Sequence, residues 1–241
     1  MKVGTDGVLL GAWAGREMEG SRGFKGFQEL NLLDIGTGTG LIALMMAQRC
    51  STQMVDCHID AVEIDTKAAQ QAAENVAASP WANQIQVYPC SLSQYMDNRK
   101  EDRLQYDLVV SNPPFYNATL KPDDEARAIA RHKDALPLTE IIQCACRTLT
   151  PRGRLALIYP MNYDSEVMTE AIAAGLKPLR ICNVLTKVGK ACKRRMVEFC
   201  LNHAETLSME CEVSTLSIRD AEGNYTSEYL DLTLPFYTHL H

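Results

Sequence analysis

The chain has 241 residues, of which 46% are hydrophobic and 22% are charged, and its formal net charge is −6. This composition excludes a disordered chain and is sufficient for a sizeable core. The sequence contains no apolar run of the ~18 residues that a membrane-spanning helix needs, and the net negative charge by itself argues against a nucleic-acid partner. We expect one domain, with an N-terminal cap segment (1–28), a core (29–201) and a C-terminal extension (202–241).

The predicted elements alternate between strands and helices. In chain order they are a strand over 30–35, a helix over 39–49, a strand over 58–64, a helix over 66–78, strands over 85–88 and 106–111, a helix over 138–149, a strand over 154–159, a helix over 165–174, and strands over 179–186 and 195–201. This alternation indicates βαβ units and a mainly parallel sheet with helices on both faces. The last two strands have no helix between them, so we expect the last of the seven strands to be antiparallel.

Nine cysteines are spread through the chain. Their odd number and their spacing fit neither a secreted disulfide framework nor a zinc site. We therefore expect free thiols in the reducing cytoplasm, and no bound metal.

A glycine-rich turn follows the first predicted strand. The run Asp34-Ile35-Gly36-Thr37-Gly38-Thr39-Gly40 allows a tight turn and a close approach of the backbone to a ligand. Its GxGxG spacing differs from the dinucleotide-binding GxGxxG and from the P-loop. Glu63 ends the next strand, where a carboxylate can accept hydrogen bonds from both hydroxyls of a ribose. The alternative for Glu63 is a solvated strand end, and Asp65 is expected to cap the helix that follows it.

These two segments, LLDIGTGTG and AVEID, resemble the first and second motifs of the class I S-adenosylmethionine-dependent methyltransferases. The resemblance implies a Rossmann-like α/β fold and S-adenosyl-L-methionine as cofactor. Ser91 stands where the family usually has an acidic residue for the adenine of the cofactor, so its hydroxyl or a backbone amide would have to supply that contact. The cofactor-binding residues that we expect are Asp6, Asp34, Gly36, Thr37, Gly38, Gly40, Glu63, Ser91 and Asn112.

The most specific motif is Asn112-Pro113-Pro114-Phe115, which directly follows the strand over 106–111. An amine conjugated to a ring is a poor nucleophile because its lone pair is delocalised. The Asn112 side-chain oxygen and the Pro113 carbonyl can each accept a hydrogen bond from one N–H group of this amine, which turns the nitrogen lone pair toward a methyl donor. The prolines fix the backbone, and Phe115 offers a face on which a base can stack. We expect all four to be catalytic, although the motif alone does not separate adenine, guanine, cytosine or glutamine nitrogen, and its alternative is an ordinary turn.

Three further segments resemble the bacterial valine-tRNA adenine-N6 methyltransferases: KVGTDGVLLGAW from Lys2, ARH from Ala130, and GNYTSEY from Gly223 with the later Phe236-Tyr237. The resemblance covers almost the whole chain and implies methylation of N6 of an adenine in tRNA, namely adenine 37 of a valine tRNA. Members of this family carry a short segment before KVGTDG, so an upstream piece or an alternative start is expected.

The N-terminal segment is expected to form a helix through Val8 to Trp13, capped by Thr5 or Asp6. Packed across the glycine loop, its start can contact the methionine end of the cofactor. The alternative, which is compatible, is a helix that only covers the sheet.

Charge is distributed unevenly, with a net charge of +5 over residues 121–200 and negative values on either side. A basic region of this kind is a candidate surface for the tRNA backbone, and its alternative is a solvated hairpin. The expected RNA contacts are Arg127, Arg131, Lys187, Lys190, Lys193, Arg194 and Arg195. We expect the protein to act as a monomer.

Three other functions fit the same motifs. The runner-up is methylation of a glutamine nitrogen in a translation release factor, and another is methylation of guanine N2 in ribosomal RNA. A non-enzyme alternative is an RNA-binding protein with a vestigial cofactor site.

Overall fold

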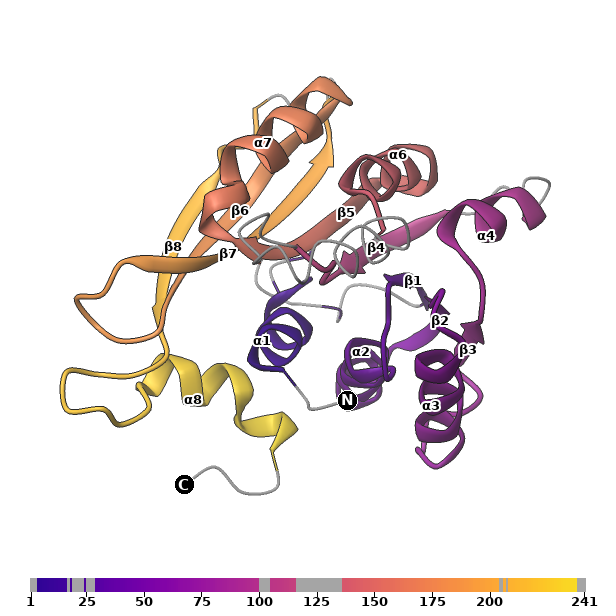
Figure 1. Ribbon diagram of the computed structural model, residues 1–241, viewed down its shortest axis with the longest axis horizontal. Helices are drawn as coiled ribbons and strands as arrows, with labels where there is room; N and C mark the ends of the chain where they lie inside the picture. Colours follow the sequence, from indigo (N-terminus) through magenta and orange to yellow (C-terminus); the bar gives the residue numbers. More distant parts are fainter. Residues whose placement is uncertain are drawn as a thin grey trace, which may run out of the picture.

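The computed structural model describes residues 4–16, 18, 24, 29–99, 105–115, 136–203, 206 and 208–237. An eight-stranded sheet runs through the molecule in the order β3-β2-β1-β4-β5-β7-β6-β8, and helices cover both of its faces (Figure 1). The strands are β1 (Glu29–Ile35), β2 (Asp56–Val62), β3 (Ile85–Tyr88), β4 (Tyr106–Ser111), β5 (Leu149–Pro160), β6 (Leu176–Leu185), β7 (Cys192–Leu201) and β8 (Glu212–Ser217).

The helices divide between the two faces. One face packs against α1 (Thr5–Trp13), α2 (Leu41–Gln53), α3 (Thr66–Ala77) and α8 (Ser227–Thr233). The other packs against α4 (Leu92–Asn98), α6 (Leu138–Thr148) and α7 (Asp164–Ala173). Two short 3-10 helices, η2 (Met161–Tyr163) and η3 (Leu234–Phe236), follow β5 and α8. Because both faces are covered, the central strands are buried almost throughout, which explains their continuous apolar runs.

The α/β class and the mainly parallel sheet are confirmed. Strands β1 to β5 pair in parallel, and β7, the last of the seven predicted strands, is antiparallel to both β5 and β6.

The prediction of seven strands was wrong, because β8 in the C-terminal extension pairs in parallel with the outer edge of β6. Most residues of β8 are exposed. An edge strand that buries little apolar surface leaves no strong hydrophobic pattern in the sequence, and this is why the eighth strand was missed.

The strand predicted over 154–159 begins earlier, because β5 starts at Leu149 and contains an irregularity near Gly153. The register of β5 against β4 shifts between Tyr106 and Leu108. A Cβ at Gly153 would lie 2.6 Å from the Tyr106 carbonyl oxygen, so only glycine allows the two strands to approach here.

The two ends of the described chain meet on one face, where α8 packs against α1 (Figure 1). Among the described residues, no helix is long and apolar enough to cross a membrane. All nine cysteines are free thiols.

Candidate active site

The predicted site residues follow three neighbouring strands at the same edge of the sheet. Ile35 of β1 pairs with Val62 of β2 on one side and with Ser111 of β4 on the other. The glycine loop, Glu63 and Asn112 are the next residues along these strands. The topology therefore brings together motifs that are up to about 75 residues apart in sequence, at the edge where open α/β sheets bind ligands.

The glycine loop has a backbone that only glycine adopts easily. Gly36, Gly38 and Gly40 have φ angles of 70°, 61° and 81°. Such left-handed conformations are strained for residues with a Cβ. The amides of Gly36 and Thr37 donate to the Val62 carbonyl oxygen at 2.8 and 3.1 Å, which ties the loop to the end of β2.

Glu63 is fixed by two backbone amides. Its Oε2 accepts from Gly38 N at 2.8 Å and its Oε1 accepts from Asp65 N at 2.9 Å. The side chain is only half-buried. A carboxylate oxygen can accept more than one hydrogen bond, so Glu63 is held in place with acceptor capacity left for a ligand.

The buried Asp34 side chain holds the glycine loop and the start of α2 in place through hydrogen bonds. Its Oδ2 accepts from Thr37 Oγ1 at 2.5 Å and from Ala43 N at 3.1 Å. Burial raises the pKa of the Asp34 carboxyl to about 7, although these two hydrogen bonds pull it down. Its second oxygen, Oδ1, is buried without a partner among the described residues.

The Asn112–Phe115 turn is anchored at both ends. Ser111 Oγ donates to the Ile35 carbonyl oxygen at 2.8 Å, which joins the end of β4 to β1. The Phe115 ring lies 4.8 Å from the Tyr163 ring and 6.1 Å from the Tyr159 ring, measured between centroids. Pro113 is buried, Pro114 is exposed, and Asn112 and Phe115 are half-buried, so the turn is fixed while part of the amide and the ring face outward.

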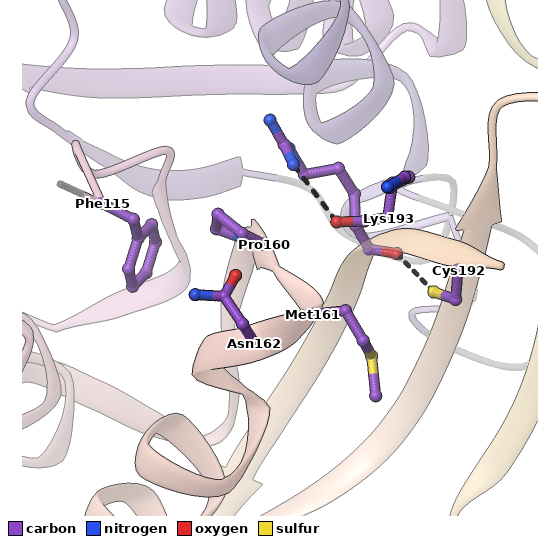
Figure 2. A pocket seen from close by; sticks show the side chains of 7 residues that line it. Phe115, Pro160, Met161, Asn162, Cys192 and Lys193 are labelled. Atoms are coloured by element: carbon purple, nitrogen blue, oxygen red, sulfur yellow. Dashed lines mark hydrogen bonds between the residues drawn. The ribbon is translucent and has the colours of Figure 1, made fainter. Parts of the chain in front are cut away.

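A pocket of about 410 Å³ opens beside Phe115. Figure 2 shows Phe115 on one side, Cys192 and Lys193 on the opposite side, and Pro160, Met161 and Asn162 between them. Arg194 completes the lining. The pocket combines an aromatic face with cationic side chains and is within the size range of small-ligand sites.

A family model of the methyltransferase small domain matches residues 24–177. The chain belongs to this methyltransferase family. Similar curated proteins extend the match over nearly the full length. One from Bacteroides fragilis is 40% identical over 98% of this chain and 91% of its own length, and one from Porphyromonas gingivalis is 41% identical over 99% and 89%. Both carry the name tRNA1(Val) (adenine(37)-N6)-methyltransferase, so the resemblance to the valine-tRNA adenine-N6 methyltransferases is confirmed.

Solved structures support the fold of this methyltransferase. A predicted O-methyltransferase from Agrobacterium tumefaciens superposes with a TM-score of 0.65 at 17% identity, over 98% of this chain and 99% of its own. A candidate class I S-adenosylmethionine-dependent methyltransferase from Listeria monocytogenes gives 0.64 at 16% identity, over 97% and 71%. The Rossmann-like class I fold is therefore confirmed.

The cofactor of the methyltransferase is S-adenosyl-L-methionine, and the residues of the site fit it. The left-handed Gly36 and Gly38 keep the start of the loop free of side chains, so a ligand could approach its backbone there. Gly40 instead allows close packing on α3, because a Cβ there would lie 3.4 Å from Ala72 Cβ. Glu63 offers acceptors for ribose hydroxyls, and the unpartnered Asp34 Oδ1 offers a buried acceptor beneath the loop. An ammonium group such as that of the methionine moiety would be a suitable donor for such an acceptor.

Ser91 has a structural role in the methyltransferase. Its hydroxyl accepts from Gln94 N at 3.2 Å, and the Gln94 side chain accepts from Ser91 N at 3.1 Å. This reciprocal pair is a capping box that begins α4. The S-x-x-Q spacing in the sequence is sufficient to predict this cap, and the contact of Ser91 with the adenine of the cofactor stays a prediction. Asp65 caps α3 as predicted, accepting from Ala68 N at 2.8 Å.

The prediction that Thr5 or Asp6 caps the N-terminal helix was wrong. The N-cap of α1 is Gly4, and no side chain caps it. Asp6 lies in the first turn, where its Oδ2 accepts from Arg194 Nε at 2.8 Å. The first turn of α1 does lie across the start of α2, because a Cβ at Gly7 would be 3.3 Å from Leu41 Cδ2 and 4.0 Å from Asn112 Nδ2.

The basic residues on the β6–β7 connection and at the start of β7 differ in their exposure and in their hydrogen-bond partners. Lys190 and Lys193 are exposed and Lys187 is half-buried. Arg195 donates to Asp164 Oδ2 at 2.6 Å and to Asn183 Oδ1 at 3.0 Å, and Arg194 is paired with Asp6. Arg127 and Arg131 lie outside the described residues.

Among the residues that the structure describes, no group of three or more His, Cys, Asp or Glu side chains could hold a metal ion.

Sequence reasoning did not find Tyr159 and Tyr163, the two aromatic side chains beside Phe115. Tyr159 is buried near the end of β5, and its hydroxyl donates to Asp164 Oδ1 at 2.9 Å. Burial raises the Tyr159 pKa far above its ordinary value. The position of Tyr159 near the end of the strand next to the Asn112–Phe115 turn could have predicted the contact.

Proposed function

We propose that this methyltransferase transfers the methyl group of S-adenosyl-L-methionine to N6 of an adenine in tRNA, namely adenine 37 of a valine tRNA. The observation that carries the proposal is the position of Asn112–Phe115, which lies at the end of β4 directly beside the glycine loop and beside the pocket. Relatives that align over nearly the whole chain are named for this reaction. We also infer that the enzyme acts as a monomer in the cytoplasm.

Asn112 and Pro113 would orient the acceptor nitrogen. The bound cofactor supplies an electrophilic methyl group. The Asn112 side-chain oxygen and the Pro113 carbonyl oxygen each accept a hydrogen bond from one N–H group of the exocyclic amine. This arrangement directs the nitrogen lone pair toward that methyl group. After transfer, the cationic nitrogen loses one proton to solvent. Rate enhancement of this kind comes from positioning and electrostatics rather than from a strong general base.

Phe115 would hold the base after it leaves the anticodon-loop stack. Stacking on an aromatic ring contributes about 1–3 kcal/mol per base. The Tyr159 and Tyr163 rings contact the Phe115 ring and limit its rotation, so its orientation is set before the base stacks on it. Extrusion of a base into a pocket is the usual solution for enzymes that modify one.

Three lysines on the β6–β7 connection and at the start of β7 supply the electrostatic part of RNA binding in this proposal. Lys187, Lys190 and Lys193 lie on the side of the pocket opposite Phe115 or on the loop leading to it. Cations in these positions neutralise backbone phosphates without reading the sequence. Arg127 and Arg131, close in sequence to the catalytic turn, are proposed as further contacts.

The test is a transfer assay with labelled cofactor and the purified protein. Separate reactions contain total tRNA, ribosomal RNA and a release factor, and nucleoside or amino-acid analysis identifies the labelled product. We expect label in N6-methyladenosine from tRNA. Label in N2-methylguanosine or in methylglutamine would establish one of the alternative enzymes. Absence of cofactor binding by calorimetry would favour a non-catalytic RNA-binding protein.

A further inference from the structure

Helix α1 is held along β7 by a polar contact at each end. At its start, Asp6 accepts from Arg194 Nε at 2.8 Å. Just beyond its end, Gly15 N donates to Glu198 Oε1 at 2.6 Å. Arg194 and Glu198 are four positions apart on the same strand, so their side chains lie on the same face of the sheet. Figure 1 shows α1 on this face, between α2 and α8.

The anchor at the C-terminal end of α1 is buried. Glu198 has an exposed fraction of 0% and also pairs with Arg154 at 2.7 Å and with Arg180 at 3.2 Å. Arg49 adds hydrogen bonds to the Gly11 and Ala14 carbonyl oxygens at 3.0 and 2.5 Å. This end of the helix is part of the folded core.

The anchor at the N-terminal end is more accessible. The Asp6 and Arg194 side chains are 34% and 38% exposed, and they are joined by one ion pair of the kind that contributes modestly to stability. Among the described contacts, the first turn is therefore the end of α1 with the weaker and more exposed polar anchor.

The first turn touches both halves of the active site. Gly7 packs so closely on Leu41, the first residue of α2 after the glycine loop, that a Cβ would lie 3.3 Å from its Cδ2. The same Cβ position is 4.0 Å from Asn112 Nδ2. Arg194, which fixes this turn, also lines the pocket beside Phe115. One ion pair thus connects the lining of the pocket to the helix turn that packs against the start of α2 and lies near Asn112.

We propose that Asp6 and Arg194 form a positioning pair, which keeps the first turn of α1 over the glycine loop and against Asn112. Arg194 then acts through Asp6 on cofactor binding and on the orientation of the catalytic amide, and not as a contact for the RNA backbone. Lys193, which lines the pocket next to Arg194, is the cation that binds the backbone phosphates of the RNA. This inference rests on the proposed function for the identity of the RNA, but its main prediction concerns cofactor binding without RNA.

The experiment compares Asp6→Asn, Arg194→Gln and the matched control Lys193→Gln. Calorimetry gives the Kd for S-adenosyl-L-methionine, and steady-state kinetics give kcat and KM for tRNA. We expect Asp6→Asn and Arg194→Gln each to weaken cofactor binding by about two- to fivefold and to lower kcat, with little change in KM for tRNA. Lys193→Gln should raise KM for tRNA and leave the cofactor Kd unchanged.

The double variant and hydrogen exchange separate positioning from a general loss of structure. Combining Asp6→Asn with Arg194→Gln should cost no more than either single change, because both remove the same interaction. Amide exchange should accelerate at Val8, whose N–H bonds to the Gly4 carbonyl oxygen at 3.3 Å, and not at Gly15.

Two outcomes would overturn the inference. One is an unchanged cofactor Kd in both single variants. The other is a rise in KM for tRNA with Arg194→Gln that equals the rise with Lys193→Gln, since Arg194 would then be an RNA contact. If the wild-type protein binds cofactor but methylates no tRNA, the proposed function fails while the cofactor affinities of the variants still test the positioning pair.

Discussion

Glu63 Oε2 accepts a hydrogen bond from Gly38 N at 2.8 Å, and this contact joins the residue after β2 to the middle of the glycine loop after β1. The two residues are 25 positions apart, and each lies in the segment that follows a parallel strand. The acidic side chain therefore shapes the loop before any ligand arrives, and it presents its remaining lone pairs at the place where the loop has no side chains.

Glu63→Gln should weaken cofactor binding by about tenfold or more. The substitution keeps the size of the side chain but removes the charge that strengthens hydrogen bonds from hydroxyl donors. Calorimetry with S-adenosyl-L-methionine measures the effect. Glu74→Gln is the matched control, because Glu74 is exposed on the adjacent α3 and its carboxylate bonds to Gln70 at 2.9 Å. If the two variants bind S-adenosyl-L-methionine equally well, Glu63 does not contact the cofactor.

Asn112→Ala should lower kcat by about 10²–10³-fold, the usual cost of removing one preorganised hydrogen-bonding group from a transition state. Because Asn112 is also expected to contact the cofactor, the affinity for S-adenosyl-L-methionine should fall as well, but by a smaller factor than kcat, which calorimetry on the same preparation would verify. A variant that keeps full transfer activity would contradict the proposed orientation of the acceptor amine.

Phe115→Leu should raise KM for tRNA about 5- to 150-fold, because the stacking contribution of about 1–3 kcal/mol is lost. Phe115→Tyr keeps the ring and should remain close to wild type. Steady-state kinetics with tRNA as the varied substrate distinguishes the two. If the leucine and tyrosine variants behave alike, the ring does not stack on the target base.

Replacing Lys187, Lys190 and Lys193 by glutamine should reduce the salt dependence of tRNA binding. Each phosphate contact contributes a slope of about 0.7–0.9 in log K against log salt, so the triple variant should lose a slope of about 2–3. Arg152→Gln is the control, since Arg152 is an exposed cation near the opposite end of β5. Equal slopes for wild type and the triple variant would exclude the hairpin as an RNA surface.

Asp34 makes the stability of the protein depend on pH. Its pKa is raised to about 7 in the fold from an ordinary 3.8, so between these values the folded state holds a proton that the unfolded state releases. This contribution is greatest below about pH 4 and falls as pH rises to about 7, with a slope approaching about 1.4 kcal/mol per pH unit. Asp34→Asn should flatten the fall in the free energy of unfolding between pH 5 and 7. Denaturant unfolding at several pH values measures it, and an unchanged slope would show that another group causes the dependence.

The parts of this site that the sequence could predict are local. The glycine loop, the Asp65 cap and the Asn112–Phe115 turn each depend on residues within a few positions of one another, and strand order then brings them to one edge. The ion pair between Asp6 and Arg194 joins residues 188 positions apart, and no periodicity in the sequence predicts such a partner.

The sequence did not predict the strand β8, for a related reason. Its residues are mostly exposed, so its place in the sheet is determined by backbone pairing with β6 rather than by an apolar pattern. The basic residues at the start of β7 show the same limit, because a run of positive charge does not reveal that Arg194 and Arg195 already have carboxylate partners.

The most direct test of the proposed function is nucleoside analysis of valine tRNA from a strain that lacks the gene, before and after treatment with the purified protein and S-adenosyl-L-methionine. We predict that adenine 37 is unmodified in this tRNA and becomes N6-methyladenosine on treatment, and that the Asn112→Ala variant fails to restore it. A full complement of N6-methyladenosine at this position in the untreated tRNA would contradict the assignment.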